Sequence, residues 1–211
     1  HIESLARGLS GLSAFSEEQP ALSLTDISQR LQLNKTTTFR LLCTLESLGY
    51  LDRDIQTKRY RPALEVLRLG FVVLNSLEVR QVAAVYLRQL VEEGQETVNL
   101  AVLDNHEVIC IDRVGSKHLV SVHRPVGSRL PAYCTSMGKA LLAFLPPEQL
   151  AEVLADTTWI RHTETTIVTP ETLKENLALV RQRGFADSDG EMFPELRDVS
   201  APIRHHDGQV V

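Results

Sequence analysis

The sequence has little of what marks membrane spans, disulfide scaffolds or exported proteins. Its longest apolar run, "LGFVVL" over residues 69–74, is far shorter than the roughly 20 residues that cross a bilayer. Nothing in it resembles a signal peptide, so we expect a cytoplasmic protein without a membrane partner. The three cysteines, Cys43, Cys110 and Cys134, form no CxxC pair, which indicates reduced thiols in or near the core.

Motifs of catalysis and metal binding are missing as well. The sequence contains no P-loop, no HExxH and no nucleophile elbow. His205 and His206 are adjacent, but neighbouring residues on a strand or turn point to opposite sides and rarely hold one metal ion together. We interpret the other histidines as surface or hydrogen-bonded polar residues. We therefore predict no enzyme, no cofactor and no metal site.

Charge is distributed unevenly along the chain. The net charge of −5 and the hydrophobic content of 43% are ordinary for a soluble globular protein. Residues 1–80 contain 10 Lys and Arg against 9 Asp and Glu, whereas residues 81–211 contain 12 against 18. A mildly basic first part and an acidic second part indicate two domains with different partners.

The first 62 residues have the pattern of a winged helix-turn-helix. Apolar residues spaced by three and four over 2–15 predict one helix, and a second is expected with Thr25 as its N-cap. Asn34 is expected to cap a third helix that runs to Leu48 and ends at Gly49. The stretch "YLDRDIQTKRYRP" then alternates and turns as a basic hairpin does. This order of elements is that of a winged helix-turn-helix domain.

The third helix is the predicted DNA-contacting element. A stripe of Thr38, Leu41, Leu42, Leu45 and Leu48 is expected to face the other two helices. Hydroxyls, cations and one aromatic ring would then remain for phosphates and base edges. The candidate DNA-binding residues are Thr25, Lys35, Thr36, Thr37, Phe39 and Arg40 on the helices, with Arg53, Lys58, Arg59 and Arg61 on the hairpin. The alternative is that Phe39 belongs to the core and the threonines are only a weak helix start.

Residues 63–79 begin a markedly apolar helical stretch, "ALEVLRLGFVVLNSLEV". We interpret them as a linker helix that forms a dimer contact, and packing within the chain is the alternative.

Residues 80–211 mix hairpins and helices, which predicts an α+β domain. Strands are expected over "ETVNLAVLD", "EVICIDRV", "LVSVHRP", "FADSDGEMF" and the last residues, and helices over "TSMGKALLAFL" and from Pro147 and Pro170, the latter closing at Gly184. Because "GQVV" reads as a strand that has only begun, we expect this domain to be incomplete at its C-terminus.

Taken in order, several segments resemble the IclR family of bacterial transcriptional regulators. They are "LSLTDISQRLQLNKTTTFRLLCTLESLGYLDRD", "RPVGSRLPAYCTSMGKALLAFLPPEQL", "RGFADSDGE" and "APIRHHDGQVV". The resemblance implies a winged helix-turn-helix that binds a double-stranded DNA operator, a linker helix, and a GAF/PAS-like α/β domain that binds a small-molecule effector. It also implies homodimers, or tetramers as dimers of dimers. The rival function is a winged-helix protein-interaction module without ligand sensing.

The resemblance also places an effector site. It falls on Ser136, Met137 and Gly138 at the start of a helix, and on Ser188, Leu196 and Asp198. A plain capped helix start is the alternative for "SMGKA". Ser188 stands where the family often has aspartate, and Asp198 where a cysteine is usual. Since a carboxylate repels a bound carboxylate, we expect the effector to offer a hydroxyl or amine towards Asp198.

Overall fold

The fold is described from a computed structural model, which covers residues 1–16, 18–116 and 125–210. The chain divides into two compact units, 1–76 and 77–211, and each is described by itself. No helix in the described part of the chain is long and apolar enough to cross a membrane.

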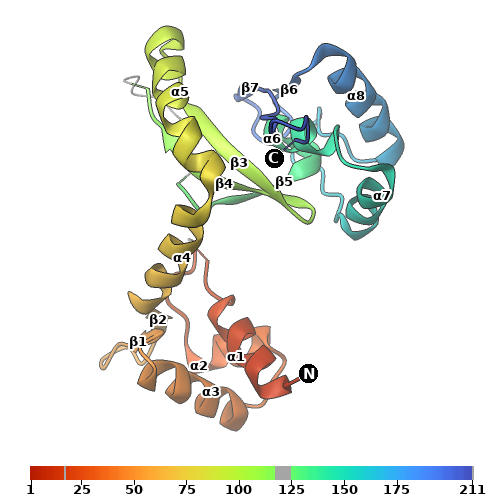
Figure 1. The fold of residues 1–211 in the computed structure, drawn as a ribbon. Coiled ribbons are helices and arrows are strands. Elements are labelled where there is room, and N and C mark those ends of the chain that lie inside the picture. Colours follow the sequence, from red (N-terminus) through yellow and green to blue (C-terminus); the bar gives the residue numbers. More distant parts are fainter. Residues whose placement is uncertain (17, 117–124, 211) are drawn as a thin grey trace. The chain divides into compact units, whose positions relative to one another are not determined.

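Three helices form the body of the N-terminal unit: α1 Glu3–Leu12, α2 Leu24–Arg30 and α3 Lys35–Ser47 (Figure 1). They close over a core of Leu22, Ile27, Leu42, Leu51 and Tyr60. The predicted cap of the third helix is confirmed, because Asn34 Oδ1 accepts a hydrogen bond of 2.8 Å from the Thr37 amide. The predicted end is also confirmed: Gly49 takes the left-handed conformation with φ +78°, as at many helix C-termini.

Two details of these helices differ from the expectation. Helix α2 is capped by Ser23 and not by Thr25, because Ser23 Oγ accepts from the Asp26 amide while the Asp26 carboxylate accepts from the Ser23 amide. This reciprocal capping box places Thr25 inside the first turn, where it is exposed. Leu48 is 60% exposed, at the C-cap position just after the last residue of α3, Ser47.

The predicted basic hairpin is present as β1 Leu51–Arg53 and β2 Tyr60–Pro62, paired antiparallel. Leu22 forms a bridge to Tyr60 on the other edge of β2, with two backbone hydrogen bonds of 2.8 and 2.9 Å. Asp54 orders the connecting turn, because its Oδ1 accepts from the amides of Gln56 and Thr57 at 2.9 and 2.6 Å. The hydrogen bond from the Thr57 amide lowers the pKa of Asp54.

The apolar stretch after the hairpin is helical but interrupted. Helix α4 runs over Glu65–Ser76, and α5 starts at Glu78 and ends at Gly94. Leu77 between them is extended, with φ −79° and ψ 100°. No residue of α4 is buried in the described chain, whereas α5 buries Ala83 and Leu87 where it packs on strands β3 and β4.

The described residues of the C-terminal unit form two small sheets. The predicted hairpin is confirmed as β3 Val98–Asp104 and β4 Glu107–Val114, and β4 also pairs with β5 Arg129–Pro131. The second sheet is the hairpin of β6 Ala186–Asp189 and β7 Arg197–Ser200. The strand expected over "LVSVHRP" lies, apart from its last residue, outside the described residues.

Helix α6, Ser136–Leu142, lies at the centre of this unit (Figure 1). It follows a 3-10 turn, η1 Ala132–Cys134, and contacts both sheets and α8. A Cβ on Gly138 would lie 2.1 Å from the Ala132 carbonyl oxygen, so only glycine permits this close approach. Helices α7 Pro147–Asp156 and α8 Pro170–Arg183 begin at prolines as predicted, and Gly184 ends α8 at φ +81°.

Candidate functional site

Helix α3 has one buried face and one exposed face. Thr38 and Leu42 are buried, whereas Lys35, Thr36 and Arg40 are exposed and Thr37 is half-buried. Phe39 is 41% exposed and is not among the core residues, so the alternative that placed it in the core is not supported. The N-terminal turns of α3 therefore present hydroxyls, cations and an aromatic ring on one surface.

The three successive threonines of α3 have different surroundings. Thr38 is fully buried, and its Oγ1 donates to the Asn34 carbonyl at 3.1 Å. That bond satisfies a buried hydroxyl inside the helix start. Thr36 is exposed. Thr38 thus stabilises the turn between α2 and α3, and only Thr36 and Thr37 remain for contacts outside the protein.

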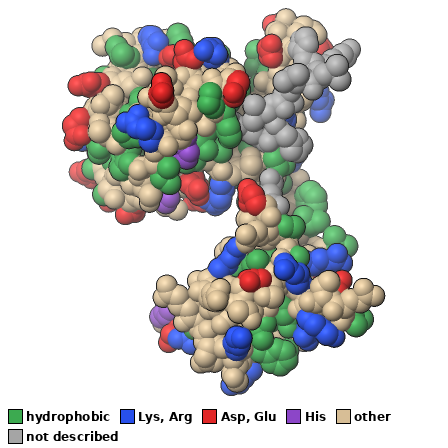
Figure 2. Space-filling view, turned by 180° about the vertical axis from the view of Figure 1, so that it is seen from behind, with side chains coloured by type: hydrophobic (Ala, Val, Ile, Leu, Met, Phe, Trp, Pro, Cys, Tyr) green, Lys and Arg blue, Asp and Glu red, His purple; other side chains and the backbone are tan. Residues whose placement is uncertain are grey.

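The four basic residues of the hairpin are all exposed, but three also have partners within the N-terminal unit. The Arg53 guanidinium lies 5.3 Å from the centroid of the Tyr60 ring, and Arg59 Nη1 donates to the Ala21 carbonyl at 3.0 Å. Arg61 is 3.6 Å from Asp52, an exposed pair of small energetic weight. Lys58 lies in the turn with φ +58°. Figure 2 shows Lys and Arg side chains on the N-terminal unit and more Asp and Glu on the C-terminal unit.

Polar side chains gather between α6 and the β6–β7 hairpin. Directly paired residues of antiparallel strands lie on the same face, and the register pairs Ala186 with Ser200 and Ser188 with Asp198. Ala186 and Ser188 are buried, so this face is turned inwards. From α6, the hydroxyl of Ser136 lies 2.7 Å from that of Ser200. We call this group the polar seam: Ser136, Lys139, Ser188, Glu191, Asp198 and Ser200.

A buried ion pair closes one end of the polar seam. Lys139 follows Ser136 by three residues, on the same face of α6, and its Nζ donates to Oε1 of Glu191. Their side chains are only 1% and 9% exposed. Burial raises the pKa of Glu191, and the Lys139 ammonium opposes this rise. The Glu191 carbonyl accepts from the hydroxyls of Thr163 and Thr166 at 3.2 and 2.7 Å, which holds the hairpin turn in place.

The structure brings together half of the expected effector residues. Ser136, Ser188 and Asp198 belong to the polar seam, and Met137 packs against the core next to them. The Gly138 amide donates to Oγ1 of Thr135 at 3.2 Å, so the helix cap already uses this amide. The lack of a side chain at Gly138 allows close packing against Ala132. The Leu196 carbonyl accepts from the Gly190 amide at 2.9 Å, in the turn of the hairpin.

Lys139 and Glu191 were not among the candidates from the sequence. The available signal was a lysine inside the otherwise small and apolar run "MGKALLAF". A charged residue within a buried helix requires a buried partner.

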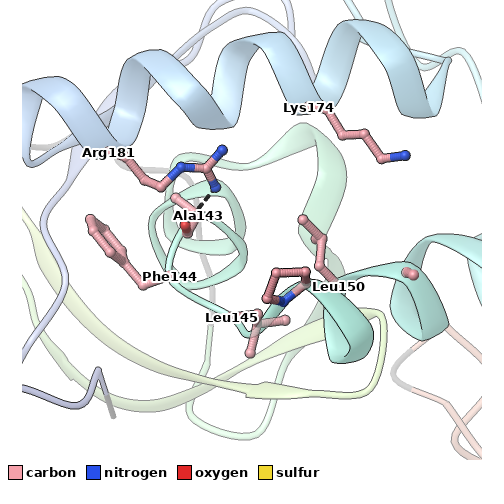
Figure 3. A pocket seen from close by; sticks show the side chains of 8 residues that line it. Ala143, Phe144, Leu145, Leu150, Lys174 and Arg181 are labelled. Atoms are coloured by element: carbon pink, nitrogen blue, oxygen red, sulfur yellow. Dashed lines mark hydrogen bonds between the residues drawn. The ribbon is translucent and has the colours of Figure 1, made fainter.

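Two hollows in the described surface lie away from the polar seam. One, of about 590 Å³, lies between the α6–α7 connection and α8, and Arg181 at its edge donates to the Ala143 carbonyl at 2.8 Å (Figure 3). The other, also about 590 Å³, lies in the N-terminal unit beside Arg30 and Arg59. Neither is lined by an expected effector residue.

Residues suited to metal binding are not grouped in the described chain. No cluster of three His, Cys, Asp or Glu able to hold a metal ion occurs there. Contrary to the expectation, the His205 and His206 rings lie against each other, with centroids 4.0 Å apart, at a turn in which the Gly208 amide donates to the His205 carbonyl at 2.9 Å. Burial raises the pKa of Cys134 to about 12, so this thiol is not a nucleophile at neutral pH.

Fold and site together define a winged helix-turn-helix DNA-binding protein with an α/β regulatory domain. Two family models match: the IclR helix-turn-helix domain over residues 4–54, and the C-terminal domain of the bacterial transcriptional regulator IclR over residues 71–211. The chain belongs to the IclR family of bacterial transcriptional regulators.

Relatives of known role are similar over nearly the whole chain. The transcriptional repressor IclR of Escherichia coli is 36% identical over 204 residues, which are 96% of this chain and 74% of the relative. The Pca regulon regulatory protein of Pseudomonas putida is 36% identical over 211 residues, 100% of this chain and 72% of the relative.

Solved structures show the same fold. An IclR-family regulator from Brucella abortus has a TM-score of 0.82 and 29% identity, covering 100% of this chain and 79% of that one. An IclR homologue from Microbacterium hydrocarbonoxydans in complex with 4-hydroxybenzoate has a TM-score of 0.81 and 28% identity, covering 98% and 85%.

Proposed function

We propose that this protein is a ligand-responsive regulator that binds a double-stranded DNA operator and controls a catabolic operon. Its DNA contacts are the half-buried Thr37 and the exposed residues Thr25, Lys35, Thr36, Phe39 and Arg40, with Arg53, Lys58, Arg59 and Arg61 of the wing. The proposal rests on the two faces of α3: Thr38 and Leu42 are buried on one face, and the other face of its N-terminal turns is exposed. In helix-turn-helix proteins this part of the second helix enters the major groove. Since its partner is bacterial DNA, the protein acts in the cytoplasm.

The effector site of this proposal is the polar seam with its neighbours Met137 and Leu196. Polar side chains at a helix–sheet interface are unfavourable unless paired, and a small polar ligand supplies further partners. The names of the relatives support an organic or aromatic metabolite, because one governs a Pca regulon and another binds 4-hydroxybenzoate. No residue is proposed to be catalytic.

DNA binding is tested by the salt dependence of affinity. Duplexes selected from a random library are titrated with the protein between 50 and 200 mM salt, and log affinity should fall linearly with log salt. The Arg40→Ala variant should bind all duplexes more weakly and reduce the slope by about 1. The matched control is Arg7→Ala, which removes a partly exposed arginine of α1 that pairs with Glu3.

A failed selection, or an affinity insensitive to salt, would contradict DNA binding. That outcome favours a winged-helix module for protein interaction, because such interfaces depend less on counterion release. An equal effect of Arg40→Ala and Arg7→Ala would refute the assignment of α3 as the contacting helix.

A further inference from the structure

One carboxylate oxygen in the polar seam has no partner in the described structure. Glu191 Oε1 accepts from Lys139, but its Oε2 is buried without a hydrogen-bond partner among the described residues. The side chain is 9% exposed. Leaving a buried acceptor unpaired is costly, and such atoms are rare in native proteins. A donor from outside the protein is therefore expected at this position.

The charges around Oε2 indicate what kind of donor fits. Desolvation opposes ionisation of Glu191 most strongly, the bonded Lys139 favours it, and the carboxylates of Asp187, itself paired with Arg183, and Asp198 oppose it. A ligand that offers only a carboxylate would place a second negative charge beside the Glu191 carboxylate. A hydroxyl donates a hydrogen bond to Oε2 without adding charge.

Lys139 fixes the position of this oxygen. Because its Nζ is bonded to Oε1 and is itself buried, the carboxylate cannot turn to offer both oxygens to water. The two threonine hydroxyls on the Glu191 carbonyl hold the backbone on the other side. The acceptor is thus preorganised, which lowers the cost of binding a ligand.

We propose that Glu191 is an effector-binding residue whose Oε2 accepts a hydrogen bond from a hydroxyl group, and that the effector is a small hydroxylated compound. Lys139 is the positioning residue for this contact. The inference rests on the proposed function and deepens it, because it adds a residue to the effector site and names the chemical group that this residue selects.

The test uses matched ligands that differ only in hydroxyl groups: 4-hydroxybenzoate and benzoate, glycerate and propionate, gluconate and hexanoate. Dissociation constants for the full chain are measured by calorimetry. At least one hydroxylated member should bind about 10- to 100-fold more tightly than its counterpart, the range expected when a buried acceptor is left unpaired. In Glu191→Gln, which keeps an oxygen for Lys139 but puts an amide NH₂ in place of the other oxygen, the preference should disappear.

The matched control is Glu195→Gln, which removes an exposed carboxylate from the same hairpin turn and should keep the preference. No preference in any pair, including no binding at all, overturns the proposal, as does an unchanged preference in Glu191→Gln. If Glu191→Gln does not fold, the comparison of the ligand pairs on the parent protein still tests the proposal.

Salt-dependent DNA binding is recorded in parallel. Its presence without hydroxyl selectivity refutes this inference alone, and its absence refutes the proposed function.

Discussion

Lys139 shows how one residue can decide the stability of a site. It is a lysine within a buried helix, and its ammonium is compensated by Glu191. Removing one member of a buried ion pair is far more damaging than replacing both, because the remaining charge stays desolvated. The polar seam therefore depends on the pair as a unit.

We predict that Lys139→Met destabilises the C-terminal unit by about 3–5 kcal/mol at pH 8. Burial already raises the pKa of Glu191, and loss of Lys139 raises it further. A carboxyl whose pKa is raised by folding binds its proton more readily in the folded chain than in the unfolded chain. Its contribution to the free energy of unfolding is therefore present at low pH and is lost as pH rises through the folded-state pKa. Urea unfolding at pH 5 and pH 8 should thus show the smaller loss at pH 5.

The control is the double variant Lys139→Met with Glu191→Gln. It removes both charges and should recover most of the stability at pH 8. Equal destabilisation of Lys139→Met at both pH values would show that lost packing, and not the buried charge, is the cause.

Helix α3 combines two tasks on opposite faces. Its inner face contributes Thr38 and Leu42 to the core, and its outer face carries Phe39 and Arg40. Threonine and phenylalanine are poor helix formers, but the Asn34 cap, the Gly49 end and tertiary packing hold the helix. The outer residues can therefore be chosen for contacts with DNA rather than for helix stability.

We predict that Phe39→Ala weakens binding to the selected duplex by about 1–3 kcal/mol and relaxes sequence preference at the bases it contacts. Its free energy of unfolding should change by less than about 1 kcal/mol, since the ring is 41% exposed. Leu42→Ala on the opposite face, with a side chain 1% exposed, should cost about 2–5 kcal/mol. Fluorescence anisotropy measures the affinity for DNA, and thermal unfolding measures the stability of each variant. A Phe39→Ala variant as unstable as Leu42→Ala would restore the core interpretation.

The chain as a whole leaves a large apolar surface on α4. Leu67, Phe71 and Val72 are between 53% and 62% exposed, and no residue of this helix is buried in the described chain. Apolar surface of this kind marks an interaction site. A second copy of the chain is the economical partner, because a two-fold dimer also fits an operator with two half-sites.

We predict that the protein is a dimer, or a tetramer of two dimers, and that Phe71→Glu separates the copies joined through α4. Sedimentation should give at least twice the chain mass of 23.6 kDa for the parent and a smaller assembly for the variant. Ser76→Glu, which adds the same charge to an exposed polar position of α4, is the control. A parent that sediments as a monomer would contradict the dimer.

Local signals in the sequence predicted the elements well but not their contacts. Asn34, Gly49, Pro147, Pro170 and Gly184 marked helix ends correctly, because caps, fixed φ angles and left-handed turns act within a few residues. Errors arose where two local signals competed: Ser23 and Thr25 are both good N-caps, and the capping box with Asp26 decided between them.

By itself, the sequence determined the winged helix-turn-helix, the α+β second domain and the family, because periodicity, caps and motif order are encoded in neighbouring residues. Only the tertiary structure decided the contents of the polar seam. Lys139 and Glu191 are 52 residues apart, and Ser136 and Ser200 are 64 apart. Their pairing follows from the packing of α6 on the β6–β7 hairpin, while Gly138 allows the same helix to approach Ala132 closely. Such long-range burial leaves no periodic pattern in the sequence, so it becomes visible only in the folded chain.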